Sequence, residues 1–166
     1  SWLNNILNAN LLPESSNNSH LKLSDLTPDN CARELDYYLP CKDFKVKVLN
    51  ELCHEFYAKV VQDNNLRHIP DLPDLKKSNF KGFMKGSLDL VAKFTTKQGD
   101  KFFMIDYKSN YLGNSFCDYT QDSILKSIFE ARYDVQILFY SLALFRFLKC
   151  TLHDFSYEKD FGGVMY

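Results

Sequence analysis

The sequence predicts an α/β fold in which helices flank a small central mixed sheet. Apolar segments of strand length follow one another between residues 80 and 108, and segments with helical periodicity lie before and after them. The composition, with 45% hydrophobic and 25% charged residues in a chain of 166, is that of one globular domain and excludes a largely disordered protein.

The N-terminal part of the chain alternates helical segments with one strand. Apolar residues at helical spacing predict a helix over 1–9, and the Asn- and Ser-rich stretch 10–19 predicts a loop. Residues 31–39 alternate polar with apolar side chains, which predicts a strand that Pro40 should end. Residues 43–61 place their apolar side chains on one face and predict an amphipathic helix.

Strand signals dominate the middle of the chain, after a polar loop predicted over 62–80. Two strands are expected over 80–86 and 87–94, and a third over 101–108. The connecting sequence TTKQGD at 95–100 contains a glycine and predicts a hairpin loop.

The C-terminal part returns to helical periodicity. After a loop at 109–117, helices are expected over 118–131 and 134–150. The second helix is apolar nearly all round and should therefore be buried. Residues 161–166 predict one more strand.

Charge and cysteine content exclude several classes of protein. A net charge of −1 excludes a protein that binds nucleic acid by bulk positive charge. The five cysteines form no CxxC pair, which argues against a disulfide framework or a zinc ribbon and indicates reduced thiols in a cytoplasmic protein. The longest uncharged apolar run, 135–145, is too short to span a bilayer, so no membrane association is expected.

Acidic residues interrupt two of the apolar strand segments. Asp89 lies in SLDLV, while Asp106 and Lys108 lie in MIDYK on the next predicted strand. Residues two apart in a strand face the same side, so Asp106 and Lys108 should share a face. A hairpin would bring Asp89 beside Asp106, and a divalent cation would remove the repulsion between the two carboxylates.

This set of groups suits metal-dependent hydrolysis of a phosphodiester. Carboxylates of Asp89 and Asp106, with the backbone carbonyl of Tyr107, are oxygen ligands that favour Mg²⁺ or Mn²⁺ over zinc. The ion would activate a water molecule, and Lys108 would position that water or stabilise charge on the phosphate. Solvated or salt-bridged strand carboxylates are the alternative without a catalytic role.

Four blocks of sequence, in the same order, carry a resemblance to a known family: GFMKGSLDLV, FFMIDYKSNYLG, YDVQILFYSLALFRFL and FSYEKDFGGVMY. Together they resemble the C-terminal nuclease domain of RecB, in the PD-(D/E)xK nuclease superfamily, from about residue 23 to residue 166. The resemblance implies a restriction-endonuclease-like core and Mg²⁺-dependent cleavage of DNA in double-strand break repair and recombination. It also implies one truncated domain, with 1–30 as a peripheral helix and linker and 31–166 as the catalytic core.

The resemblance assigns roles to the residues that match the family's nuclease motif. It implies that Asp89 and Asp106 bind the metal and that Lys108 is the catalytic lysine. The backbone carbonyl of Tyr107 matches the family's usual main-chain metal ligand.

Matches outside the motif imply further site residues. Glu34 resembles the upstream acid of this fold, although Asp36 lies on the same strand face and is an alternative. Gln136 and Tyr140 match a QxxxY motif on the DNA side of such sites, and their spacing of four places them on one helix face.

The resemblance further implies partners and a longer parent protein. RecC, RecD and the ATP-binding helicase part of the same chain are expected partners, with DNA as the substrate. The family carries an additional histidine on an early helix, and none of the four histidines here lies in that context. We therefore expect a fragment that is weakly active or inactive in isolation.

Two other functions compete with this expectation. The first is a non-catalytic, nuclease-like docking module of the same complex, which would be expected to lose the two acids and the lysine. The second is a stand-alone restriction enzyme or junction resolvase, against which the four RecB-like blocks argue.

Overall fold

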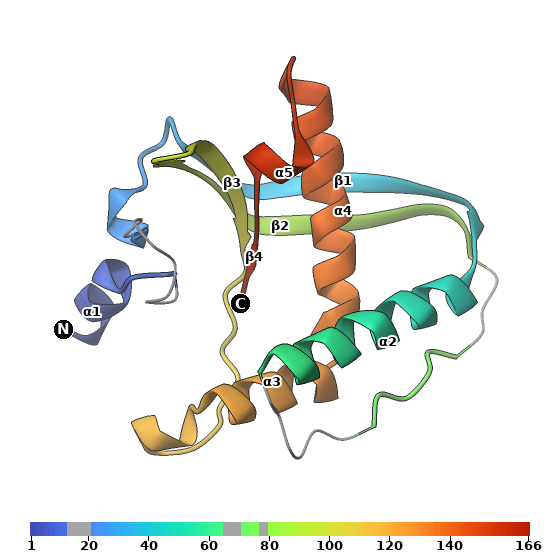
Figure 1. Cartoon of the computed structure of the whole chain (residues 1–166), viewed down its shortest axis with the longest axis horizontal. Helices are drawn as coiled ribbons and strands as arrows, with labels where there is room; N and C mark the ends of the chain where they lie inside the picture. Colours follow the sequence, from blue (N-terminus) through green and yellow to red (C-terminus); the bar gives the residue numbers. More distant parts are fainter. Residues whose placement is uncertain (13–20, 65–70, 77–79) are drawn as a thin grey trace. The chain divides into compact units, whose positions relative to one another are not determined.

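A computed structural model describes residues 1–12, 21–64, 71–76 and 80–166 of the chain. Within them lies a four-stranded mixed sheet of order β1-β2-β3-β4, which confirms the predicted α/β fold (Figure 1). The strands are β1 Cys31–Phe44, β2 Phe80–Thr96, β3 Gly99–Ile105 and β4 Phe161–Met165. The helices are α1 Trp2–Asn8, α2 Val46–Asp63, α3 Gln121–Glu130, α4 Tyr133–Thr151 and α5 Tyr157–Asp160, with short 3₁₀ turns η1 Leu23–Asp25 and η2 Phe116–Asp118.

The chain folds into two compact units, each built from separate stretches of sequence. The first unit comprises Ser1–Tyr37, Gly86–Tyr107 and Ser141–Tyr166, and the second comprises Tyr38–Lys85 and Lys108–Tyr140. Strands β1 and β2 and helix α4 each contribute residues to both units.

A β-hairpin forms the centre of the first unit. Strands β2 and β3 pair antiparallel from Leu90↔Ile105 to Thr96↔Gly99, so the turn consists of Lys97 and Gln98. Gly99 has a φ of 113°, a conformation that residues with a side chain rarely adopt. The predicted hairpin is confirmed, with strands that extend further into the TTKQGD segment than expected.

Strand β4 lies beside β3 and runs parallel to it, which confirms the strand predicted at the end of the sequence (Figure 1). Gly162 permits this pairing, because a Cβ at that position would overlap the ring of Phe103. The apolar faces of β2 and β3 then form the core of this unit, together with Leu21. Its buried members are Leu21, Leu90, Ala92, Phe94, Phe103 and Ile105.

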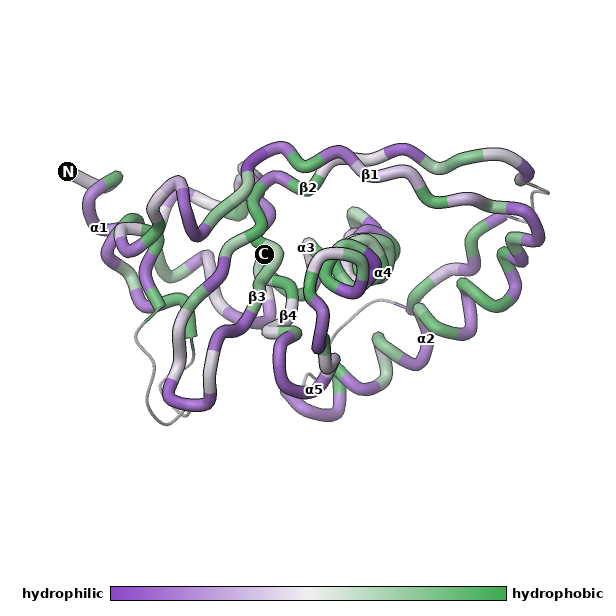
Figure 2. The backbone as a smooth tube through the Cα atoms, turned by 90° about the horizontal axis from the view of Figure 1, so that it is seen from above, coloured by the Kyte–Doolittle hydropathy of each residue, from purple (hydrophilic) through white to green (hydrophobic). Residues whose placement is uncertain are grey.

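The second unit has its own core, in which α2 packs against α3. Leu49 and Cys53 of α2 are buried against Phe129 of α3, and the Tyr57 ring meets the Phe129 ring edge-on at 4.8 Å. Hydrophobic and hydrophilic residues alternate along α2, as predicted for an amphipathic helix (Figure 2).

A buried ion pair fixes the junction between α3 and α4. The Arg132 guanidinium donates two hydrogen bonds of 3.0 Å to the Asp134 carboxylate, which is 0% exposed, and one of 2.7 Å to the carbonyl of Pro73. Arg132 adopts a left-handed φ of 57°. Burial, together with the nearby Asp134, raises the pKa of the Cys53 thiol to about 11, so this thiol stays protonated.

Several predicted boundaries prove wrong. Strand β1 continues through Pro40 to Phe44, because an edge strand has only one neighbour and tolerates a missing N–H. The two strands expected over 80–86 and 87–94 are one, β2. Gly86 does not end a strand there; it makes room for the Tyr37 side chain, which a Cβ would overlap.

Two further expectations need correction. Strand β3 ends at Ile105, not at residue 108. Helix α4 is not buried on all sides, since Leu142 is 44% exposed and Phe147 36% exposed. The helices predicted over 118–131 and 134–150 are otherwise confirmed as α3 and α4.

The predicted loops fall partly on residues that the structure does not describe. Of the loop expected over 10–19, residues 13–19 lie outside the described part, and of the loop expected over 62–80, residues 65–70 and 77–79 do. In the described part of the chain, no helix is both long and apolar enough to cross a bilayer.

Candidate active site

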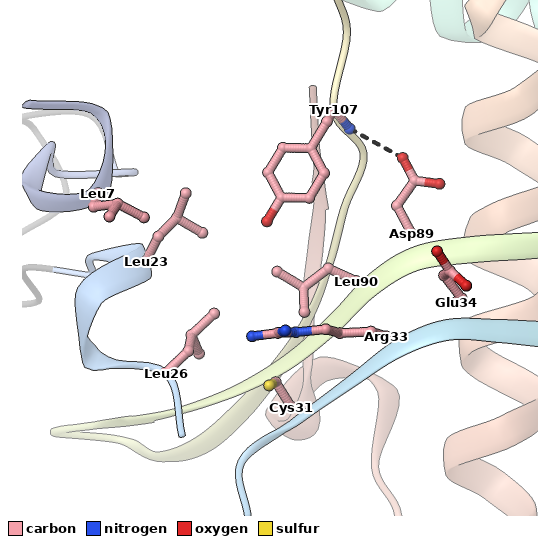
Figure 3. Close-up of a pocket in the computed structure, with 9 residues that line it drawn as sticks. All are labelled: Leu7, Leu23, Leu26, Cys31, Arg33, Glu34, Asp89, Leu90 and Tyr107. Atoms are coloured by element: carbon pink, nitrogen blue, oxygen red, sulfur yellow. Dashed lines mark hydrogen bonds between the residues drawn. The ribbon is translucent and has the colours of Figure 1, made fainter. Parts of the chain in front are cut away.

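Asp89 and Asp106 lie opposite each other where the β2–β3 hairpin ends. The last residue pair of the ladder is Leu90↔Ile105, and the two acids follow it by one position on each strand. The backbone N–H of Tyr107 donates a hydrogen bond of 3.2 Å to the Asp89 carboxylate, which ties the end of β3 to β2 (Figure 3). The antiparallel register therefore places the two acidic residues at the same end of the hairpin, although Asp106 is not among the described residues that line the pocket around Asp89.

Asp106 belongs to the first unit and is buried. Only 4% of its surface is exposed. Its backbone N–H donates a hydrogen bond of 3.0 Å to the carbonyl of Met165 in β4. Tyr107 is 58% exposed. Since β3 has ended at Ile105, strand alternation does not determine which way Lys108 faces, contrary to the sequence prediction.

Glu34 reaches the same region through an unusual backbone conformation. Successive residues of a strand normally point to opposite faces. Glu34 has a φ of 49°, and Arg33 and Glu34 consequently both line the pocket that contains Asp89 (Figure 3). The described residues that line it include Glu34 but not Asp36, which favours Glu34 as the upstream acid.

This pocket, called here the Asp89 pocket, lies wholly within the first unit and has a volume of about 430 Å³. In the view of Figure 3, leucines from α1 and η1 lie on the left, the carboxylates of Glu34 and Asp89 lie on the right, and Tyr107 lies between them. The lining residues are Leu7, Leu23, Leu26, Cys31, Arg33, Glu34, Asp89, Leu90 and Tyr107.

The surroundings of Tyr107 in this pocket shift the pKa of its hydroxyl group. Partial burial raises the pKa of Tyr107 above its usual value, the Arg33 guanidinium opposes that shift, and the Asp89 carboxylate adds to it. The phenol is therefore protonated at neutral pH and can donate a hydrogen bond.

A chain of hydrogen bonds positions Lys108 in the second unit. The Lys108 ammonium donates to the Gln136 side-chain carbonyl at 2.8 Å, and the Gln136 amide nitrogen donates to the Tyr140 hydroxyl at 2.5 Å. The ammonium also lies 4.2 Å from the ring centroid of Tyr133. Gln136 and Tyr140 thus lie on one face of α4, as their spacing of four residues predicts.

Tyr133 and Asn110 are members of this group that sequence reasoning missed. The Tyr133 hydroxyl donates to the Asn110 side-chain carbonyl at 3.2 Å. The spacing of three between Tyr133 and Gln136 was the available signal, because residues three apart share a helix face. Nothing in the local sequence marks Asn110 as its partner.

The donor atoms around Asp89 are of the kind that Mg²⁺ binds. Glu34 and Asp89 supply carboxylates to one pocket, and Asp106 lies across the hairpin from Asp89. No group of three or more His, Cys, Asp or Glu side chains is arranged to hold a metal ion among the residues described. Mg²⁺ commonly takes only one or two protein carboxylates and completes its shell with water and substrate phosphate, so this donor set fits it.

The two described histidines each pair with an aspartate, and neither lines the Asp89 pocket. His54 pairs with Asp74 at 2.8 Å, and His153 pairs with Asp154 at 3.1 Å. His20 and His68 lie outside the described residues.

Comparison with known proteins finds RecB subunits among the relatives of this chain, although no family model matches it. The chain is similar to the RecBCD enzyme subunit RecB of Haemophilus influenzae, with 34% identity over 166 residues, which is 99% of this chain and 12% of that protein. RecB of Escherichia coli is 31% identical over 166 residues, again 99% of this chain and 12% of the relative. RecB of Mycobacterium tuberculosis is 31% identical over 86 residues, or 52% of this chain.

Proposed function

This chain is homologous over 99% of its length to a segment of the RecBCD enzyme subunit RecB, and from that premise we propose that it is a Mg²⁺-dependent DNA nuclease domain. The chain spans 12% of the length of the relatives from Haemophilus influenzae and Escherichia coli, so the activity of a whole RecB is itself part of the proposal. The observation that carries it is the placement of Asp89 and Asp106 opposite each other on the hairpin, with Glu34 in the same pocket as Asp89.

We propose that the acids hold the metal. Asp89 and Asp106 would bind it with the backbone carbonyl of Tyr107, and Glu34 would accept a hydrogen bond from a water molecule bound to it. When bound, Mg²⁺ or Mn²⁺ supplies Lewis acidity toward a phosphate oxygen and lowers the pKa of bound water. The Tyr107 N–H that donates to Asp89 fixes the orientation of this carboxylate, and fixed ligand orientation strengthens metal binding.

Lys108 follows Tyr107 directly in the chain, and we propose that it stabilises charge on the phosphate oxygens. Its hydrogen bond to Gln136, which is itself oriented by Tyr140, and its contact with the Tyr133 ring restrict the Lys108 side chain. A preorganised cation stabilises a transition state better than a mobile one, because less reorganisation is needed when the reaction occurs.

The proposed setting follows from the names of the relatives, which are subunits of RecBCD enzymes. We propose DNA as the substrate, RecC, RecD and the helicase part of the same protein as partners, and the cytoplasm as the location. The processing of double-strand breaks for recombination is the corresponding role.

A docking module without catalysis is the alternative function. Such a module has no need for Asp89, Asp106 and Lys108, and all three are present here in the order of the motif. Their retention favours the nuclease.

The test uses the full-length protein in its complex, with substitutions Asp89→Asn, Asp106→Asn and Lys108→Met. Each should lower the rate of DNA cleavage by about 100-fold or more while ATP hydrolysis continues. EDTA should abolish cleavage, and added Mg²⁺, but not Zn²⁺, should restore it.

Asp100 provides the matched control on the same hairpin. It lies in β3 near the turn, where it accepts a hydrogen bond from Thr95 and pairs with Lys93 at the surface. Asp100→Asn removes one carboxylate from the same hairpin and should leave cleavage unchanged. Normal cleavage by Asp106→Asn, or cleavage that persists in EDTA, would overturn the proposal.

A further inference from the structure

The Asp89 pocket has an apolar half that metal binding does not explain. Four leucines and Cys31 line it, drawn from α1, η1 and the residue after it, β1 and β2. Three of these leucines, Leu7, Leu23 and Leu26, lie far from Asp89 in the sequence and face it across the pocket (Figure 3). A metal site alone needs only the carboxylates, so this half of the pocket calls for a ligand of its own.

Two side chains connect the apolar half to the acidic half. Tyr107 is 58% exposed and lies between the leucines and Asp89 in the view of Figure 3. Arg33 extends from β1 toward Leu26, and it enters the pocket beside Glu34 because of the left-handed backbone at that residue. An exposed aromatic ring and a guanidinium plane both stack on flat ring systems.

We propose that the apolar half of the Asp89 pocket is a nucleobase subsite, in which one base of the bound DNA strand packs against Tyr107 and the leucines. The proposal rests on the proposed nuclease function for the position of the phosphate, which lies at the acidic half. A volume of about 430 Å³ lies within the range of pockets that bind small ligands. Since the ring contacts require an open base face, the base must be unstacked and unpaired when it enters.

The chemical parts of a nucleotide match the parts of the pocket. Its phosphate fits the carboxylate half only with a cation present, because Glu34 and Asp89 repel it otherwise. Its base fits the aliphatic and aromatic half, where stacking tolerates any of the four bases. Arg33 then has two uses, as a stacking plane for the base and as a donor to the phosphate.

Cys31 provides a direct readout of whether the subsite is occupied. It lines the apolar half of the pocket, whereas Cys117 and Cys150 are exposed elsewhere. In the full-length protein, alkylation by iodoacetamide is followed for each cysteine peptide by mass spectrometry. With Mg²⁺, dAMP should slow the alkylation of Cys31 and leave the other two unchanged, while deoxyribose 5-phosphate, which lacks a base, should slow none of them.

Variants of Tyr107 test the stacking surface. Tyr107→Ala should weaken protection of Cys31 by dAMP about 5- to 150-fold in concentration, the range that stacking on one aromatic ring provides, while Tyr107→Phe should retain it. Tyr157→Ala is the matched control, since Tyr157 is a 49% exposed tyrosine of the same unit that is not among the residues lining the pocket.

A second measurement does not depend on cysteine chemistry. An oligonucleotide with one abasic position, moved along the strand, should be cleaved more slowly when that position meets the subsite. Equal protection of Cys31 by dAMP and deoxyribose 5-phosphate, or equal cleavage at every abasic position, overturns the base subsite. Deoxyadenosine, which lacks the phosphate and therefore needs no cation, separates the two proposals. In EDTA it should still slow the alkylation of Cys31 if the base subsite exists, whereas failure of the nuclease proposal would appear as unchanged cleavage by Asp106→Asn.

Discussion

The left-handed backbone of Glu34 leads us to expect that glycine at this position gives a more stable protein than alanine, the reverse of the usual order in a strand. A φ of 49° costs a residue with a side chain roughly 1–2 kcal/mol, and glycine is free of that cost. Glycine also loses about 0.5–1 kcal/mol relative to alanine through its greater freedom in the unfolded chain. We therefore expect Glu34→Gly to be more stable than Glu34→Ala by up to about 1.5 kcal/mol.

Ala32, two residues earlier in the same strand, provides the control. Its backbone is not among those with positive φ, so Ala32→Gly should lower the free energy of unfolding by about 0.5–1 kcal/mol. The same exchange of alanine for glycine thus has opposite effects at positions 32 and 34.

Urea denaturation of the four proteins, the wild type and the three variants, measures these differences from the transition midpoints and slopes. DNA cleavage is measured in parallel on the full-length protein. Both Glu34 variants lack the carboxylate, so both should cleave more slowly than the wild type despite their different stabilities. A Glu34→Gly protein that is less stable than Glu34→Ala, as at position 32, would refute the argument from backbone conformation.

Two further predictions concern the second unit. Arg132→Met leaves the buried Asp134 carboxylate without its ion-pair partner and should lower the free energy of unfolding by about 3–5 kcal/mol. The double variant Arg132→Met/Asp134→Leu removes that carboxylate as well and should recover part of the lost stability in the same urea assay. Burial and Asp134 raise the pKa of Cys53 from 9.0 to about 11. Between these two pH values the folded state retains a proton that the unfolded state releases. The stability present below pH 9 is therefore lost as the pH rises to about 11. Unfolding at several pH values should show a loss of up to about 3 kcal/mol over that interval, and a smaller loss in Cys53→Ala, whereas identical slopes would contradict the assignment.

The sequence predicted those elements whose pattern is local. Residues of α2 repeat with helical spacing over five turns, and the β2–β3 hairpin is marked by alternating apolar residues around a polar turn. The continuation of β1 through Pro40 could not be predicted, because a proline is permitted or forbidden according to whether its strand lies at an edge. Strand order is a property of the whole sheet and not of the segment around Pro40.

The candidate site was predictable to a similar extent. A regular hairpin places Asp89 and Asp106 opposite each other, so spacing alone was enough to pair them. The choice between Glu34 and Asp36 required the φ of Glu34, and glutamate has no special preference for the left-handed region. The leucines of the Asp89 pocket look like ordinary core residues in the sequence, because their position beside Asp89 depends on long-range folding.

The hairpin also determines where the chain can change in length. The ladder from Leu90↔Ile105 to Thr96↔Gly99 fixes the number of residues between the turn and each acid, because the residues of the two strands are paired one to one. One residue inserted within either strand would slip the register, rotate one carboxylate to the opposite face of the sheet and separate the pair. An insertion at Lys97 and Gln98 lengthens only the tip and moves neither acid. Tags, reporters or natural insertions are therefore tolerated at the tip. The strands between the tip and the two acids cannot change in length by a single residue without separating the acids.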